Sequence, residues 1–318
     1  MVQVTVEGVA ADLNSDGSFT FPSLFVPSNG TSVKIEAIDK WGNKSQKIVR
    51  LSREAVQTAA LSFAPLNPTT FSAKRNADAV ALIIGIADYK RTAKAKFADR
   101  DAEFFRDYAT RKLGVPEGNV KVLTNDTAGM ADIIEATNVW LPAATKPNRS
   151  DVYVFFAGHG LGSDDGKEVY LLPYSVIPKV LEKTAVLRSE LFDKISAAKP
   201  KSVTVFLDTC YSGTSRSEEI LLAQRGISIV PKEQSIPKGF TVFSAAGMKQ
   251  TAKMLAEAKH GLFSYYLMKG MEGPADSNKD RKITAGELHQ YVLANVSRLQ
   301  RNQTPEMQGD GERVLVAW

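Results

Sequence analysis

The sequence predicts an α/β fold in which a mostly parallel sheet is flanked by helices and preceded by a small all-β segment. Apolar runs suited to buried strands occur at residues 79–87, 151–157 and 202–207, and turn residues bound each run. Segments with apolar residues at helical spacing lie between these runs, and such alternation implies parallel strands with helices on both faces. Residues 1–52, by contrast, contain only short strand-like segments.

The composition is that of an ordinary globular protein with two domains, or with one large and one small domain. The chain has 318 residues, 43% hydrophobic and 24% charged, with a formal net charge of +5. This charge is spread without a basic block, so we expect no nucleic-acid partner. The longest apolar run has nine residues, too few to span a bilayer. One cysteine excludes an internal disulfide, and three histidines beside it give no zinc-site spacing.

Residues 1–52 predict a β-sandwich segment, because short strands alternate with turns such as Asn14–Gly17 and Lys40–Asn43. The stretch A-I-D-K-W-G-N-K-S resembles the ending of bacterial Ig-like modules. A length of about 50 residues is short for a complete sandwich, so a truncated one is an open alternative. We expect either a spacing or adhesion role or a β-extension packed on the next domain. No signal peptide is recognisable, and an Ig-like segment would favour an extracytoplasmic location if the full-length chain is exported.

Residues 53–77 predict a linker, since Pro65 and Pro68 stand among small residues. The α/β domain then covers 78–318. In this domain we expect one helix that ends at Gly114, a second that ends at Pro142, and a polar loop at 214–239. The remaining expected strands and helices are a strand at 120–123, a hairpin piece at 168–172, a helix at 188–198, a strand at 240–244, helices at 261–271 and 285–299, and a last strand at 313–317.

Cys210 and His159 each follow a buried strand and begin a turn of small residues, in D-T-C-Y-S-G and A-G-H-G. Open α/β sheets bind ligands at the carboxyl ends of their strands. A thiol needs an imidazole to raise its thiolate fraction and to protonate the leaving amine. We therefore expect a Cys210–His159 dyad, with the N–H groups of Gly160 and Cys210 as an oxyanion hole. His260 is the rival base, although packing or capping would be ordinary for it, and His289 is expected at the surface.

The two motifs resemble those of caspase-like cysteine peptidases (peptidase C14), and D-T-C-Y-S-G is similar to the metacaspase and bacterial orthocaspase form. The separation is 210 − 159 = 51 residues, which matches the known caspase spacing of about 50. The resemblance covers roughly 78–318 and implies a cysteine endopeptidase that needs no cofactor for its chemistry. A catalytically silent binding module is the alternative, and an adhesion protein dominated by its sandwich is disfavoured.

The resemblance also implies a specificity pocket. In metacaspases, the acid two residues before the nucleophile lines the pocket for the P1 residue, and that acid is Asp208 here. A second acid from the first helix matches Asp101, with Asp99 as the competing choice, and Ala157 is the small residue before Gly-His. Two carboxylates would select protein or peptide substrates with Arg or Lys at P1. The same preference makes Arg225, and next Arg216, candidate self-cleavage sites; the sequence does not predict the oligomeric state.

Calcium is the one candidate cofactor that the sequence offers. Residues 276–287 match an EF-hand loop through Asp276, Asn278, Asp280 and Glu287, whereas Arg281 occupies the position that prefers Gly. The calcium-binding Asp cluster of calcium-dependent metacaspases is not recognisable. Two further acidic stretches, at 12–17 and 164–165, are expected to be a plain turn and a solvated loop.

Overall fold

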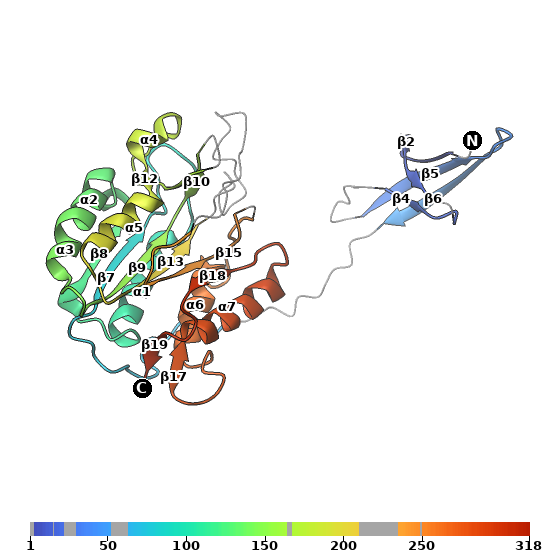
Figure 1. The fold of residues 1–318 in the computed structure, drawn as a ribbon. Coiled ribbons are helices and arrows are strands. Elements are labelled where there is room, and N and C mark those ends of the chain that lie inside the picture. The colour runs from blue at the N-terminus through green and yellow to red at the C-terminus, as the bar shows by residue number, and fades with distance from the viewer. Residues whose placement is uncertain are drawn as a thin grey trace. The chain divides into compact units, whose positions relative to one another are not determined.

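The computed structural model describes residues 3–14, 16–21, 30–51, 63–163, 167–209, 235–248 and 250–318. The chain divides into two compact units, Met1–Ser62 and Phe63–Trp318. The first unit is small and all-β in its described residues, as the sequence predicts, and the second carries a mixed sheet with flanking helices (Figure 1).

The N-terminal unit contains an antiparallel sheet in the order β2-β1-β5-β6 and a separate hairpin of β3 and β4. Val4, Val6 and Val33 are buried. The turn between β5 and β6 is the A-I-D-K-W-G-N stretch, where Asp39 accepts hydrogen bonds from the backbone N–H groups of Trp41 and Asn43. The strands are β1 (Gln3–Val6), β2 (Val9–Ala10), β3 (Asp12–Leu13), β4 (Phe19–Thr20), β5 (Thr31–Ile38) and β6 (Lys44–Leu51).

The second unit is built on a six-stranded sheet in the order β18-β14-β13-β9-β7-β8. All neighbours are parallel except β14 and β18, which run antiparallel. Every residue of β7 is buried because helices cover both faces of the sheet. The strands are β7 (Val80–Gly85), β8 (Val120–Thr124), β9 (Asp151–Ala157), β13 (Ser202–Asp208), β14 (Phe240–Ser244) and β18 (Glu306–Gly309).

Helices α1, α6 and α7 pack together on one face of the sheet, and α3 and α5 lie on the other (Figure 1). Their bounds are α1 (Ala98–Arg111), α2 (Met130–Glu135), α3 (Leu141–Ala144), α4 (Leu181–Thr184), α5 (Arg188–Ala197), α6 (Leu262–Met271) and α7 (Ala285–Leu299). A π-helical segment, η3 (Ala136–Trp140), joins α2 to α3, and 3-10 turns occur at η1 (Glu117–Asn119), η2 (Asn125–Thr127) and η4 (Pro178–Val180). The minor strands are β10 (Gly160–Gly162), β11 (Val169–Leu171), β12 (Val186–Leu187), β15 (Met254–Leu255), β16 (His260–Gly261), β17 (Lys282–Thr284) and β19 (Val314–Ala317).

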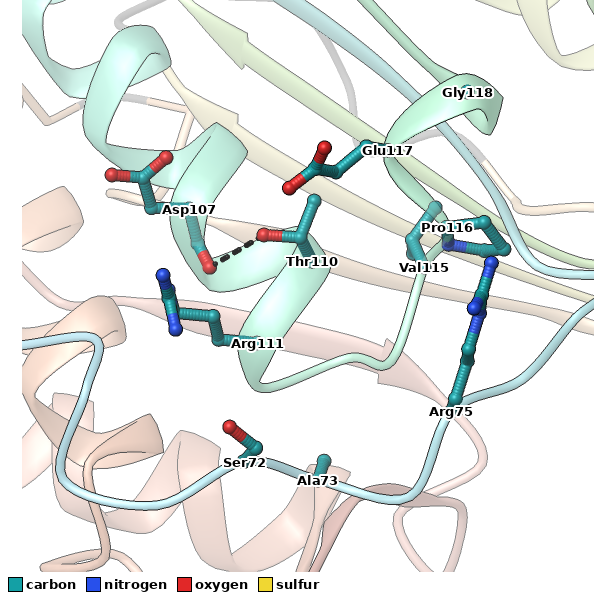
Figure 2. A pocket seen from close by; sticks show the side chains of 10 residues that line it. All are labelled: Ser72, Ala73, Arg75, Asp107, Thr110, Arg111, Val115, Pro116, Glu117 and Gly118. Atoms are coloured by element: carbon teal, nitrogen blue, oxygen red, sulfur yellow. Dashed lines mark hydrogen bonds between the residues drawn. The ribbon is translucent and has the colours of Figure 1, made fainter.

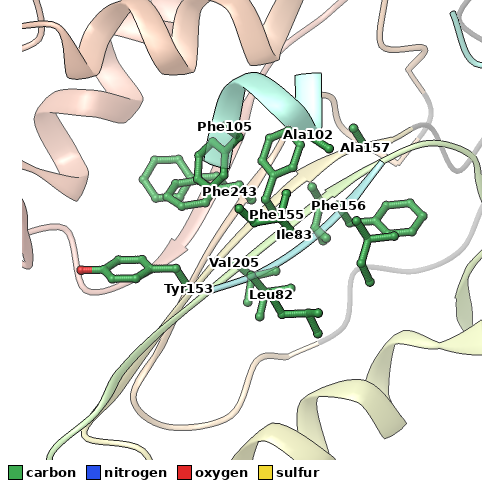
Figure 3. Packing of buried hydrophobic residues seen from close by; sticks show 14 of the residues in the cluster. Leu82, Ile83, Ala102, Phe105, Tyr153, Phe155, Phe156, Ala157, Val205 and Phe243 are labelled. Carbon is green, nitrogen blue, oxygen red and sulfur yellow. The ribbon is translucent and has the colours of Figure 1, made fainter. Parts of the chain in front are cut away.

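The core between α1 and the sheet contains a row of aromatic rings in contact (Figure 3). Phe105 of α1 stacks on Phe155 of β9 with ring centroids 4.4 Å apart and contacts Phe206 of β13 at 5.4 Å. Phe206 in turn contacts Phe243 of β14 at 5.1 Å. Such pairs contribute about 0.5–1.5 kcal/mol beyond the burial of their area. The row fixes α1 across β9 and β13, the two strands that lead to the expected active site.

Gly85 at the end of β7 lets the first turn of α1 approach the sheet closely. A Cβ at this position would lie 2.4 Å from the Ala102 Cβ and 2.4 Å from the Ala98 carbonyl oxygen. Real Cβ contacts are not this short, so only glycine fits between this strand and this helix. The consequence is that Asp101, on the same turn of α1, is held near the carboxyl end of the sheet.

Three expectations differ from the structure. Pro142 does not stop a helix, because it lies in the first turn of α3, where its missing N–H costs little. The expected last strand is present as β19 and pairs with β17, but the edge of the main sheet is formed by β18, a strand that the sequence did not predict. Residues 63–77, expected within the linker, pack on the second unit, and we call this segment the strap.

The strap is held by contacts with residues far away in the sequence. Phe71 stacks on Trp318 with ring centroids 4.1 Å apart, and Phe63 meets Tyr265 edge-on at 5.8 Å. The ammonium of Lys112, fully buried, donates to the Thr70 hydroxyl at 2.7 Å and to the Phe71 carbonyl at 2.6 Å. The boundary between the two units therefore falls before residue 63.

Candidate active site

The ends of β7, β9 and β13 meet at one edge of the sheet. Ala157 pairs with Gly85 on one side and with Asp208 on the other, and the Gly158 N–H donates to the Asp208 carbonyl at 3.2 Å. The turn that carries His159 therefore starts beside Asp208, two residues before Cys210 in the sequence. Cys210 itself lies outside the described residues, as do Arg216 and Arg225. The structure thus brings the two predicted strand ends together and describes the histidine side of the pair.

His159 is almost fully buried and its ring orientation is fixed by a backbone carbonyl. The His159 Nε2 lies 2.8 Å from the Ala93 carbonyl oxygen. A carbonyl can only accept a hydrogen bond, so Nε2 must carry the proton in this arrangement. In the neutral ring Nδ1 is then the basic nitrogen, the form that a general base requires.

Tyr89 is a residue of the site that the sequence analysis missed. Its hydroxyl accepts a hydrogen bond from the His159 backbone N–H at 2.7 Å and donates to the Leu172 carbonyl at 3.2 Å. Its ring stacks on the imidazole with centroids 4.6 Å apart. A Cβ at Gly158 would lie 2.6 Å from the Tyr89 hydroxyl oxygen, so the approach depends on glycine there. Tyr89 thus holds both the backbone and the ring of His159.

The two predicted pocket acids are fully buried and both bind residues at the N-terminal end of α6, Asp101 those directly before the helix and Asp208 one in its first turn. Asp101 accepts from the Gly261 N–H at 2.9 Å and contacts His260 Nδ1 at 2.7 Å. Asp208 accepts from the Ser264 N–H at 3.3 Å and from the Ser264 hydroxyl at 2.5 Å. The positive end of a helix dipole favours carboxylates at this position.

Asp99, the alternative to Asp101 as the second pocket acid, has different hydrogen-bond partners. Its carboxylate is half-buried and accepts from the Asn125 side-chain amide at 3.0 Å. The Asn125 side-chain oxygen in turn accepts from the N–H groups of Ala87 and Asp88. Asp99 therefore helps to fix the loop that follows β7, whereas α6 gathers Asp101 and Asp208.

A comparison with protein families gives this site its context. The model of the caspase domain of the C14 peptidases matches residues 78–314. The chain belongs to this caspase family. This family is one of cysteine peptidases, which are hydrolases that act on protein substrates.

Three proteins that resemble this chain are distant from it in sequence. Metacaspase-1 of Eremothecium gossypii is 24% identical over 159 residues, and this match covers 46% of the chain and 34% of the metacaspase. A protein of known structure from Geobacter sulfurreducens is similar with a TM-score of 0.54 and 17% identity, over 75% of this chain and 98% of that one. Caspase-1 from Spodoptera frugiperda gives a TM-score of 0.50 and 14% identity, over 77% and 92% of the two chains. At these identities the two structures establish the caspase-like fold.

Other predicted site residues of the caspase domain have defined places. Gly160 begins β10, is buried and pairs with Leu171, directly after His159. Ala157 belongs to the buried core. His289 is half-buried, with Nε2 3.1 Å from the Pro305 carbonyl, so the expectation of a surface histidine was wrong. Within the described residues no helix is both long and apolar enough to cross a membrane.

In the EF-hand-like loop of the caspase domain, the polar side chains accept hydrogen bonds from the loop's own backbone N–H groups. Asp276 accepts from the N–H groups of Asp280 and Arg281, and Asn278 accepts from Asp280. Arg281 adopts the positive φ of 63° for which glycine is preferred. Glu287 accepts from the Thr284 N–H and caps α7. In the ranges that the structure describes, no three His, Cys, Asp or Glu side chains gather as metal ligands.

A pocket of about 480 Å³ lies at the C-terminal end of α1, between the strap and η1 (Figure 2). Arg75 and Arg111 line it together with Asp107 and Glu117. Asp101 belongs to the opposite end of the same helix, and none of the predicted site residues lines the pocket. We therefore do not assign the peptidase chemistry to this pocket.

Proposed function

We propose that the caspase domain is a cysteine endopeptidase that uses Cys210 as nucleophile and His159 as base, and that cleaves after Arg or Lys. The observation that carries the proposal is the pairing of Ala157 with Asp208. Because these two strand ends are neighbours, the turns that follow them begin side by side, and one turn contains His159 while the other contains Cys210.

In this proposal the His159 Nδ1 takes the proton of the Cys210 thiol, and the thiolate attacks the carbonyl carbon of the scissile bond. The developing oxyanion accepts hydrogen bonds from the N–H groups of Gly160 and Cys210. The imidazolium then gives its proton to the leaving amine as the C–N bond breaks. A water molecule, deprotonated by His159, hydrolyses the thioester and restores the thiol. The hydrogen bond from His159 Nε2 to the Ala93 carbonyl supports the role of His159 as base, because it keeps the proton of the neutral ring on Nε2 and leaves Nδ1 unprotonated.

The preference for Arg or Lys rests on Asp208 and Asp101. Both carboxylates are buried within one turn of α6, so a cationic P1 side chain would be attracted and an acidic one repelled. A hydrogen bond to a charged group is worth roughly 1.5–3 kcal/mol. We expect Asp208→Asn to lower kcat/KM toward P1 Arg substrates by about 10- to 150-fold.

The test is a set of electrophilic peptides that differ only at P1, with intact-mass detection of the covalent product. Wild type should be labelled by the Arg and Lys peptides, and Cys210→Ala by none. His159→Ala should lower peptide hydrolysis by about a thousandfold or more with an unchanged circular dichroism spectrum. Preference for P1 Asp would overturn the pocket assignment. Lack of both labelling and turnover would favour a catalytically silent binding module.

A further inference from the structure

His260 lies against one of the two pocket acids and has no part in the proposed chemistry. Its side chain is buried, and Nδ1 lies 2.7 Å from Oδ1 of Asp101. The other oxygen of Asp101, Oδ2, accepts the N–H of Gly261, the next residue after His260. Two donors from consecutive residues therefore hold the Asp101 carboxylate by both of its oxygens.

The imidazole of His260 is itself fixed on several sides. Phe104 of α1 meets it edge-on at 4.9 Å, and Tyr265 of α6 lies at 6.3 Å. Backbone pairing between His260 and Leu255 in the β15–β16 hairpin fixes its main chain. Arg100 stacks on the Phe104 ring at 4.8 Å. Because these contacts fix the imidazole independently of Asp101, His260 can determine the orientation of the Asp101 carboxylate.

The second pocket acid is held from the same helix by a different kind of donor. Asp208 Oδ2 accepts both the backbone N–H and the hydroxyl of Ser264, which is three residues after Gly261. The N-cap residue of a helix and the third helical residue lie close together at the helix start. His260 and Gly261, directly before α6, thus hold Asp101, and Ser264 in the first turn of α6 holds Asp208.

We propose that His260 is a positioning residue that makes the pocket selective for arginine over lysine at P1, an inference that rests on the proposed function. A guanidinium is a planar fork with five donors in fixed directions, and it gains most from carboxylates whose planes do not move. An ammonium is a compact point charge with rotatable donors, and it can be satisfied by a mobile carboxylate. Releasing Asp101 from His260 therefore weakens arginine binding more than lysine binding.

The experiment compares kcat and KM for two peptide substrates that differ only by Arg or Lys at P1. Wild type should favour Arg by about tenfold or more in kcat/KM. His260→Phe should reduce this ratio about tenfold, mainly by raising KM for the Arg substrate. His260→Asn should restore part of the ratio, because its side-chain amide nitrogen can take the place of Nδ1. His289→Asn is the matched control, since His289 of α7 contacts the Pro305 backbone carbonyl and neither pocket acid, and it should leave the ratio unchanged.

A double-mutant comparison separates positioning from mere packing. If His260 acts through Asp101, His260→Phe should change the Arg to Lys ratio no further in an Asp101→Asn background. An unchanged ratio in an active His260→Phe enzyme, even with a lowered Tm, would overturn the inference and leave the proposed function standing. Equal cleavage after Arg and Lys by wild type would also overturn it. A wild type that cleaves neither substrate would overturn the proposed function itself.

Discussion

Tyr89 shows how a single hydroxyl can hold the backbone of His159, the proposed catalytic base. It accepts the backbone N–H of His159 and donates to the Leu172 carbonyl, while the Leu172 N–H donates to the His159 carbonyl at 3.0 Å. These three bonds fix the turn on both sides of the imidazole. The ring of Tyr89 covers one face of that imidazole.

We expect Tyr89→Phe to keep the stacking and lose the hydroxyl. A buried N–H left without its partner costs about 1–3 kcal/mol, so urea denaturation should show a loss of this size. The value of kcat should fall with little change in KM, because the substitution moves the base and not the pocket. Tyr174→Phe, at a half-buried tyrosine against the same core, is the control. Unchanged kcat in Tyr89→Phe would show that the hydroxyl does not position His159.

At the scale of elements, the strap is tied to the caspase domain by a buried lysine. Burial lowers the pKa of Lys112 from 10.5 to about 8. The folded state therefore binds fewer protons than the unfolded state between pH 8 and 10.5, and the free energy of unfolding must rise with pH across this window.

This gives a prediction for Lys112→Met, whose side chain is similar in length and carries no charge. In a Cys210→Ala background, urea denaturation at pH 7.5, 8.5 and 9.5 should show a rise in stability that Lys112→Met lacks. A variant at Lys74, an exposed residue of the strap, should keep the rise in stability with pH. Identical pH profiles for the parent and Lys112→Met would contradict the assignment of the rise to Lys112.

The loop at 276–287 carries the calcium prediction. Its backbone adopts the turn that an EF-hand requires at Arg281, yet its carboxylates already accept hydrogen bonds from backbone N–H groups within the loop itself. If the loop binds calcium, the ion should raise Tm, since a native-state ligand stabilises the fold, and Asp276→Asn should abolish the shift. Calorimetry without heat of binding at millimolar calcium would remove the proposal.

The sequence predicts the elements with strong local patterns and misses those that depend on distant partners. The strands that lead to His159 and Asp208 are long apolar runs, and the structure confirms them. Tyr89 is a single aromatic residue in a loop, and its partner is a backbone N–H 70 residues away. The strap has the composition of a linker, but Asn67 donates to Glu272, 205 residues later. The edge strand β18, with the sequence E-M-Q-G, carries no apolar run.

At the scale of the whole molecule, the proposed self-cleavage concerns the connection between β13 and β14. These strands are parallel neighbours from Val203 and Phe240 onward, so a cut between them would leave both fragments in one sheet. Arg225, and next Arg216, are the proposed sites, and they lie outside the described residues.

We expect fresh protein to contain two fragments under denaturing conditions and one species of full size in gel filtration. The sum of the fragment masses should exceed the intact mass by one water molecule. Arg225→Ala should shift or suppress the cut. Fragments that persist in Cys210→Ala would show that another peptidase makes them.

The docking of the strap also determines where the chain can be divided without damage. A shortened protein that begins at residue 63 would keep Thr70 and the Phe71 carbonyl as partners of Lys112, and the Phe71–Trp318 stack. One that begins at 78, where the family match starts, would expose the Trp318 ring and leave the Lys112 ammonium without these two acceptors. Boundaries chosen by family resemblance alone would therefore yield an unstable domain, and a preparation judged inactive for that reason would say nothing about the proposed catalytic residues.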